Sequence, residues 1–277
     1  MIEISHQTNT LKIKERLCSP FPFALRRARK AKLYDYDNHK FFDFYLQNGS
    51  VILGYNPTQL STFLKNSLSR GYLGHYPSHF ELKAREQIKH VLCPGYHIYF
   101  FHATRDFKER LAAQVEPARW QNYLPAENLD PKKILYLDAY TLRAPLPPAD
   151  GYLFSPALAN GWPVLTLALQ EPLENLISDP LPLLAYQAIY KTLALYDKGF
   201  FERNFKKLLA PHLSGLLDLG GGIFKLKNRE LSPKLNRELY SLGIYLDPEQ
   251  KNLFLSQGTE PHQLAYLLKA LDRVNGV

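Results

Sequence analysis

The sequence has few of the cysteines that form disulfide bonds in small secreted domains, since Cys18 and Cys93 are the only cysteines among 277 residues. Two cysteines cannot form a disulfide framework, and they do not show the clustered Cys/His spacing of a zinc module. No run of about 18 apolar residues occurs, which argues against a membrane-spanning helix. The first five residues also lack the basic-then-apolar pattern of a secretory signal. These absences predict a soluble, cytoplasmic protein with no membrane partner.

The charge is unbalanced toward the positive side, with 34 Lys and Arg against 26 Asp and Glu, a formal net charge of +8. The densest basic cluster lies near the N-terminus: Arg26, Arg27, Arg29, Lys30 and Lys32. A solvated surface is the interpretation we favour, because protein surfaces ordinarily carry such charge. No RRM, helix-turn-helix or basic-zipper pattern accompanies the cluster, so nucleic acid is not the expected partner. An acidic protein partner stays open.

Two local patterns near the N-terminus predict elements directly. Residues 33–45 alternate around Asp37–Asn38, and Asx residues tolerate the turn of a β-hairpin. Asn56–Pro57 is typical of a helix start, with Asn56 as the cap, and the apolar spacing that follows is helical until Gly71.

The remaining patterns alternate between strands and helices. Ser78 and Glu81 form a predicted capping box that starts a helix ending before Pro94. Expected strands cover residues 96–101, 134–137, 152–154, 164–167, 222–226, 244–246 and 253–255, and expected helices 183–195, 200–209, 232–242 and 261–273. Such alternation favours an α/β architecture.

Several segments match one family in the right order along the chain. They are residues 33–43, 49–57 (Gly-Ser-Val-Ile-Leu-Gly-Tyr-Asn-Pro), 154–164 (Phe-Ser-Pro-Ala-Leu-Ala-Asn-Gly-Trp-Pro-Val), 179–181, 243–248 and 255–256. In this order they resemble the class III aminotransferases, in particular the glutamate semialdehyde aminomutases. The third segment is similar to that family's Ser-Lys-Ala-Leu-Gly-Gly-Gly-x-Pro motif, and Asp179-Pro-Leu to its Asn-Pro-Leu.

The resemblance implies a reduced PLP-dependent transferase type I fold of the α/β class. It predicts a shrunken large domain with a mostly parallel sheet, and a small α+β domain. We expect residues 1–45 to join the small domain, residues 46–210 to form the large domain, and residues 211–277 to complete the small one. Members of the family are dimers, so a homodimer is expected.

The positions that would hold pyridoxal phosphate depart from the family pattern. Pro156 stands at the position of the Schiff-base lysine, and a proline has no amine to form an imine. Ala103 and Thr104 replace small phosphate-loop residues, and Asn175 lies where the partner-facing threonine is expected. Asp138 matches the aspartate that pairs with the pyridine nitrogen, although a carboxylate at a strand end could equally cap a turn. We therefore expect no covalently bound cofactor and no catalytic residue of the family's kind.

A deletion accompanies these changes, because only 32 positions separate Asp106 from Asp138, where the family has a much longer stretch. Residues 113–133 hold three prolines and are expected to form a connector across the surface. Metal binding is not expected, because Pro77 between His75 and His79 breaks the helical spacing that would align them.

Two further features have ordinary structural interpretations. Gly220–Gly222 is not followed by the Lys-Ser/Thr of a phosphate loop. For Cys93 the sequence identifies no general base that could activate a nucleophile, so we expect Cys93 to be a structural thiol.

Three functional hypotheses follow. The leading one is a pseudoenzyme, a non-catalytic aminotransferase homologue that acts through dimerisation or partner binding. The second is an enzyme that reuses the remaining cleft for a different small molecule, with His102, Arg105 or Asp138 as polar groups. The third is an accessory subunit that binds an active aminotransferase or an acidic partner through its basic face.

Overall fold

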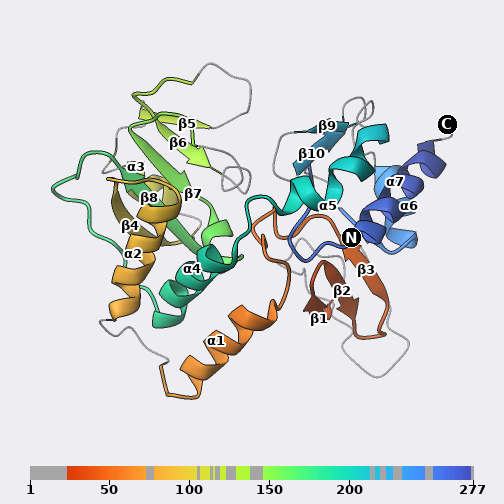
Figure 1. Ribbon diagram of the computed structural model, residues 1–277, viewed down its shortest axis with the longest axis horizontal. Helices are drawn as coiled ribbons and strands as arrows, with labels where there is room; N and C mark the ends of the chain where they lie inside the picture. Colours follow the sequence, from red (N-terminus) through yellow and green to blue (C-terminus); the bar gives the residue numbers. More distant parts are fainter. Residues whose placement is uncertain are drawn as a thin grey trace.

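The computed structural model describes residues 24–72, 78–104, 107–112, 115, 119–122, 129–137, 146–212, 216–218, 223–226, 233–246 and 252–275. Figure 1 shows two lobes joined by the segment that contains α4 and α5, with α1 projecting at the base. None of the helices in these ranges has the length and apolar character needed to cross a bilayer.

The larger lobe is organised around a five-stranded sheet. Its order is β4 (His97–His102), β8 (Val164–Leu169), β7 (Gly151–Phe154), β6 (Ile134–Leu137) and β5 (Trp120–Asn122). The β5–β6 and β6–β7 pairs are parallel, whereas β8 is antiparallel to both β4 and β7. The sheet is therefore mixed rather than mostly parallel. The short β7–β8 connection explains this, because a parallel pair needs a longer crossover.

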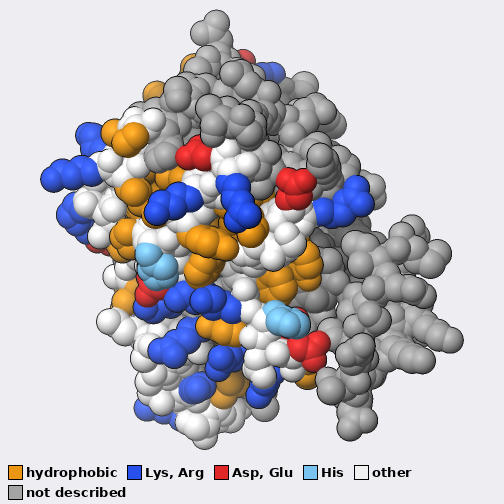
Figure 2. Space-filling view, turned by 90° about the vertical axis from the view of Figure 1, so that its right-hand side faces the viewer, with side chains coloured by type: hydrophobic (Ala, Val, Ile, Leu, Met, Phe, Trp, Pro, Cys, Tyr) orange, Lys and Arg blue, Asp and Glu red, His pale blue; other side chains and the backbone are white. Residues whose placement is uncertain are grey.

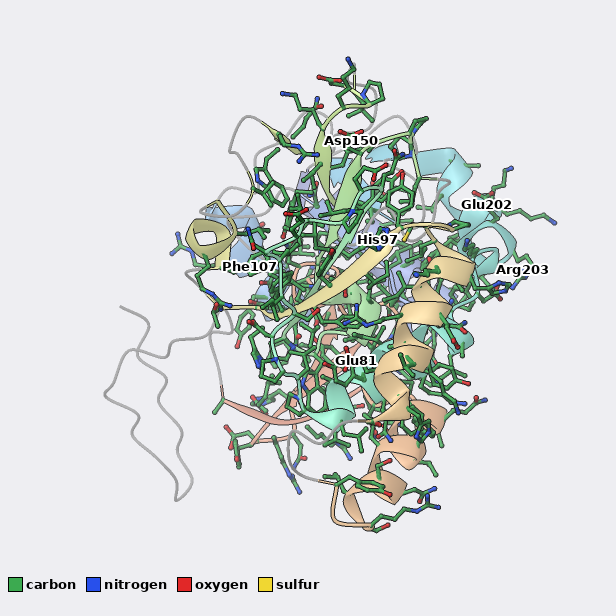
Figure 3. The ribbon with its side chains drawn as sticks, turned by 90° about the vertical axis from the view of Figure 1, so that its left-hand side faces the viewer. Glu81, His97, Phe107, Asp150, Glu202 and Arg203 are labelled. Carbon is green, nitrogen blue, oxygen red and sulfur yellow. The ribbon has the colours of Figure 1, made fainter. Side chains whose placement is uncertain are left out.

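Apolar layers cover both faces of this sheet. Successive residues of β8 point to opposite faces, so Val164 joins one cluster and Leu165 the other. On one face α2 (His79–Val91) and α4 (Leu183–Leu195) pack against the strands, and α1 (Thr58–Leu68) packs on α4. On the opposite face Phe107 and Leu111 of α3 (Phe107–Ala112) join the cluster. Figure 3, in which Glu81 and Phe107 are labelled, shows α2 and α3 on either side of β4.

The smaller lobe begins with a four-stranded sheet in the order β1 (Leu25–Arg29), β2 (Lys32–Asp35), β3 (Lys40–Asp43) and β11 (Ile244–Tyr245). The predicted hairpin is confirmed as β2–β3, and Asn38 in its turn adopts a φ of 63°. The parallel β3–β11 pair joins the N-terminal segment to the C-terminal part of the chain. This pairing is what the expected domain division requires, and the boundaries of that division stay a prediction.

The rest of the smaller lobe consists of a second sheet and the helices that pack with it. They are β9 (Leu216–Asp218), β10 (Ile223–Leu226), β12 (Asn252–Phe254), α5 (Phe200–Leu209), the 3-10 turn η4 (Ala210–His212), α6 (Pro233–Ser241) and α7 (Pro261–Asn275). The three strands are antiparallel, with β10 in the centre. An apolar cluster that includes Phe44, Phe205 and Leu267 fills the space between these elements.

Two local expectations are wrong. Asn56 does not cap α1, because it adopts a left-handed φ of 50° and Pro57 occupies the cap position without a side-chain bond. Residues 113–133 are more than a surface connector, because they contain β5 and the buried Val115. The Ser78 cap of α2 is confirmed, with its hydroxyl accepting a hydrogen bond from the Phe80 N–H at 3.1 Å.

Candidate functional site

Three of the five predicted cofactor positions lie where β4, β6 and β7 end and β8 begins. The Ala103 N–H donates to the Pro163 carbonyl at 3.0 Å, and the Ser155 N–H donates to the Leu137 carbonyl at 2.9 Å. Ala103, Thr104 and Pro156 therefore lie at one end of the sheet, which is where open α/β sheets place their ligands. Ala103 and Pro156 are half-buried and Thr104 is exposed.

After β7 the chain turns into η3 (Pro156–Ala159), which is held tightly. The Ser155 hydroxyl accepts a hydrogen bond from the Ala157 N–H at 3.4 Å, and η3 turns the side chains of Ala157, Leu158 and Ala159 into the apolar core. Asn160 ends the turn in a left-handed conformation, with a φ of 52°. Residues 156–161 are thus an integral part of the packing of the lobe.

Asn160 ties this turn to the segment that precedes α1. Its amide oxygen accepts a hydrogen bond from the Leu53 N–H at 2.8 Å, and its amide nitrogen donates to the Gly54 carbonyl at 3.1 Å. A methyl group added at Gly161 would lie 2.8 Å from the Gln47 side-chain oxygen. The two segments are therefore packed without space for a substrate between them at these points.

A carboxylate that the sequence analysis placed only in the Asp179-Pro-Leu segment, without a site role, contacts the end of β4. Asp179 accepts hydrogen bonds from the His102 N–H at 2.9 Å and from the Arg110 guanidinium at 2.7 Å. The His102 ring nitrogen lies 3.2 Å from the Pro180 carbonyl oxygen. Asp179 lies ten residues after the end of β8, in a loop that returns to the opposite end of the sheet, so no local pattern in the sequence places it beside His102.

The Ser178 hydroxyl extends the same contact along β4. It accepts a hydrogen bond from the Phe100 N–H at 3.1 Å and lies 3.2 Å from the Arg85 guanidinium of α2. Asn175 lies in an exposed turn upstream of this segment. Asp138 and Arg105 lie outside the described residues, as do His75 and Gly220–Gly222.

One buried hydroxyl near the site has no partner among the described residues. Thr166 of β8 is 1% exposed and pairs across the sheet with Phe100 on one side and Phe154 on the other. Its neighbours are aromatic, and the Phe100 ring also meets the Tyr186 ring of α4 at 5.2 Å. Thr166 therefore lies among aromatic rings beneath the sheet end.

The groups with strongly raised pKa values lie elsewhere. Burial raises the pKa of the Asp43 carboxyl to about 6, against hydrogen bonds from the Tyr55 hydroxyl at 2.7 Å and from the N–H groups of Tyr45 and Leu46, which lower it. Burial also raises the pKa of the Cys93 thiol to about 12. A thiol with such a pKa stays protonated at neutral pH, which agrees with a structural Cys93.

One cluster in the described residues has ligand atoms close enough for a metal, formed by Asp35, Asp37 and His39. Asp35 already accepts hydrogen bonds from the Asp37 and His39 N–H groups at 2.9 and 2.8 Å, and its second oxygen lies 2.8 Å from the His39 ring. These contacts are those of an Asx turn in the β2–β3 hairpin. They explain the cluster without a metal.

Comparison with known proteins gives matches of two kinds. No protein-family model matches the chain. A 69-residue stretch is 33% identical to the glutamate-1-semialdehyde 2,1-aminomutase of Saccharolobus islandicus, covering 25% of this chain but 16% of the aminomutase. An uncharacterized protein of Borreliella burgdorferi is 32% identical over 87 residues, covering 31% of this chain and 32% of that protein. This chain is thus shorter than the aminomutase and close in length to the Borreliella protein.

The solved structures match over a greater length. An omega-transaminase from Sphaerobacter thermophilus gives a TM-score of 0.69 at 12% identity, with 96% of this chain and 93% of that chain covered. A likeness at this level of identity establishes the fold and leaves the chemistry to the residues. The expected reduced transaminase fold is confirmed, and the chain is aminotransferase-like.

Proposed function

We propose that this chain is a non-catalytic aminotransferase homologue, which has lost pyridoxal phosphate binding and acts through dimerisation or partner binding. The observation that carries the proposal is Pro156, at the position that the resemblance assigns to the Schiff-base lysine. Imine formation needs a primary amine, and proline offers none. The turn that follows is buried in the core, so no neighbouring side chain of η3 replaces the amine.

The phosphate end of the site supports the same conclusion. A phosphate group needs free N–H donors and positive charge. At the end of β4 the His102 N–H and the Arg110 guanidinium both bind the Asp179 carboxylate. An anionic side chain there competes with a phosphate for these two donors and repels it. The described residues therefore do not fit the cofactor, and we derive no step through it.

The proposal is tested by titrating the purified protein with pyridoxal phosphate and recording the visible absorption band of a lysine imine. We expect no band, and no lysine modified stoichiometrically after borohydride reduction and peptide mass analysis. The Pro156→Lys variant, checked for folding by circular dichroism, is expected to remain without the band because the phosphate donors are still taken by Asp179. A stoichiometric adduct on the unmodified chain would overturn the proposal.

An exposed apolar pair supports partner contact through the larger lobe. Leu82 of α2 is 62% exposed and Ile177 is 80% exposed. The Arg85–Ser178 contact brings their two segments together. Clustered apolar side chains at the surface are typical of protein interfaces, and the contact between the two segments supports such a cluster here. We propose that they contribute to a homodimer contact.

This contact is tested by measuring mass in solution by light scattering. Ile177→Glu is expected to shift a dimer toward monomer, whereas Tyr36→Glu, on an exposed aromatic of the other lobe, is expected to leave the mass unchanged. Equal effects of the two substitutions, or a monomeric unmodified chain, would remove Leu82 and Ile177 from the interface.

A further inference from the structure

One face of the β1–β2–β3 sheet gathers cations and aromatic rings into a regular array. The register places Arg27, Tyr34 and Lys40 opposite one another in one row, and Arg29, Lys32 and Phe42 in the next. Directly opposed residues share a face, and residues two apart on a strand share it as well. We call these six side chains the outer face: Arg27, Arg29, Lys32, Tyr34, Lys40 and Phe42. The intervening Leu33 and Phe41 are buried on the inner side.

Three of the four cations of the outer face have no carboxylate partner within the described part of the chain, whereas Lys32 pairs with Glu260 at 2.8 Å. In that part, no carboxylate lies within ion-pair distance of Arg27, Arg29 or Lys40. The guanidinium of Arg27 lies 4.1 Å from the centre of the Tyr34 ring, and the Lys40 amine lies 5.0 Å from that of Phe42. Cations held beside one another without counter-charge repel, so a bound anion would stabilise this arrangement.

Aromatic side chains continue from the outer face onto α7. The Phe42 ring meets the rings of His262 and Tyr266 edge-on, at 6.1 and 5.6 Å between centres, and Tyr266 is 40% exposed. Figure 2 shows this side of the molecule, where blue Lys and Arg side chains gather around orange apolar ones. Cations and rings therefore lie beside one another from the outer face to α7, with the Glu260 carboxylate among them.

We propose that the outer face binds single-stranded nucleic acid. Such ligands combine a phosphate backbone, which Lys and Arg neutralise, with unpaired bases, which stack on aromatic rings. The outer face supplies both kinds of group side by side, in the two rows of its register. A duplex offers phosphates but hides its base faces, so it would use the cations and leave Tyr34 without a role.

An acidic peptide fits less well. The usual way for a peptide to bind a sheet is to add a strand at the edge. The sheet has two edges; β11 is buried, and the register of the other edge, β1, shifts between Leu25 and Arg27. Such an irregularity twists an edge away from further pairing. A peptide would also make no use of the rings.

This inference supplies a partner for the proposed function without resting on it. The outer face lies on the smaller lobe, whereas Pro156 and Asp179 lie at the sheet end of the larger lobe. A positive cofactor titration would overturn the loss of pyridoxal phosphate binding and would leave nucleic-acid binding to be decided by its own measurement.

The test is fluorescence anisotropy of the full chain with a labelled thymidine oligomer of about 12 nucleotides, a length within the usual site sizes. The variants compared are R27Q/R29Q/K40Q, Tyr34→Leu, and the matched control K65Q/K89Q/K207Q, which removes three exposed lysines from other surfaces. Affinity is measured over a series of salt concentrations, and folding of each variant is checked by circular dichroism.

The two outer-face variants are expected to fail in different ways. R27Q/R29Q/K40Q should weaken binding at least tenfold and reduce the slope of log affinity against log salt by about 2, at roughly 0.7 for each lost phosphate contact. Tyr34→Leu should weaken binding at least about fivefold and leave the slope unchanged, because stacking releases no counterions. K65Q/K89Q/K207Q should bind the oligomer with an affinity within about twofold of that of the unmodified chain.

Three outcomes would overturn the proposal. The first is no binding at low salt, and the second is an equal loss of affinity in K65Q/K89Q/K207Q and R27Q/R29Q/K40Q. The third is preference for a duplex or for a poly-glutamate peptide of matched length, with Tyr34→Leu binding as well as the unmodified chain. Preference for the peptide would assign the outer face to an acidic protein instead.

Discussion

The sheet end of the larger lobe and the outer face of the smaller lobe treat polar groups in opposite ways. At the sheet end Asn160 and Asp179 bond to other parts of the chain, and η3 is buried. On the outer face Arg27, Arg29 and Lys40 point to solvent without a carboxylate partner among the described residues. The polar groups at the sheet end are therefore used within the fold, whereas these cations of the outer face stay available to a ligand.

The largest effect on stability is expected at Gly54, where the segment that precedes α1 meets the smaller lobe. Gly54 has a φ of 82°, and a methyl group there would lie 2.9 Å from both the Gly258 Cα and the Lys30 carbonyl oxygen. Gly54→Ala therefore combines backbone strain with a clash against backbone atoms that cannot rotate away. We expect a loss of about 3 kcal/mol in the free energy of unfolding, measured by urea denaturation.

Gly95→Ala is the matched control for this substitution. Gly95 has a similar φ of 85°, but a methyl group there meets no atom within 4 Å. It should cost about 1 kcal/mol, the strain alone. Equal losses in the two variants would show that the contact between Gly54, Gly258 and Lys30 is not a tight one.

A second prediction concerns the inner side of β3, behind the outer face. The pKa of Asp43 is about 6 in the folded protein and has an ordinary value of 3.8. Between these values the folded chain binds the extra proton, so the free energy of unfolding falls as pH rises from about 4 to 6, by about 2 kcal/mol. Asp43→Asn should flatten this dependence in thermal melts across that range.

Asp130→Asn, on an exposed carboxylate, is the control and should keep the slope. If Asp43→Asn keeps it too, another group titrates in this range, and the buried carboxylate is already protonated or already ionised throughout.

The smallest effect is expected at Glu260, the carboxylate that contacts the edge of the outer face. Its carboxylate pairs with Lys30 at 2.6 Å and Lys32 at 2.8 Å, and these contacts lower its pKa to about 2. A lowered pKa stabilises the fold above pH 4.5, and this stability is lost as pH falls toward 2. Glu260→Gln should therefore cost less than about 1 kcal/mol at pH 7, because the lysines are solvent-accessible.

The same substitution should strengthen oligonucleotide binding severalfold at low salt, since it frees Lys32 of the outer face and Lys30 beside it. Binding and stability would then move in opposite directions in one variant. Unchanged or weaker binding would place the nucleic acid away from Lys30 and Lys32.

Elements encoded by adjacent residues could be predicted from the sequence. Ser78 predicts the start of α2, and the apolar spacing of residues 183–195 predicts the bounds of α4. Asn38 predicted the hairpin turn because its side chain tolerates a left-handed backbone. The same tolerance misled at Asn56, whose left-handed conformation prevents the capping role. A residue type can signal a turn or a cap, and only the neighbouring packing decides between them.

Features that depend on distant partners could not be predicted. Strand β5 is three residues long and exists because β6 pairs with it. The contact of Asp179 with His102 joins residues 77 positions apart. The spacing of the basic cluster in the sequence does not reveal that Arg27, Tyr34 and Lys40 line up across three strands, because that alignment depends on the register.

The β3–β11 pairing fixes the order in which the chain can finish folding. Phe42 of β3 takes its partner from roughly 200 residues later, and the Phe42 N–H bonds to the Gly243 carbonyl at 2.7 Å. On a ribosome the β2–β3 hairpin therefore emerges early with one side uncovered, while the five-stranded sheet can close before it. The smaller lobe must be completed last, and until then the apolar side chains of Leu33 and Phe41 are open to aggregation or to a chaperone.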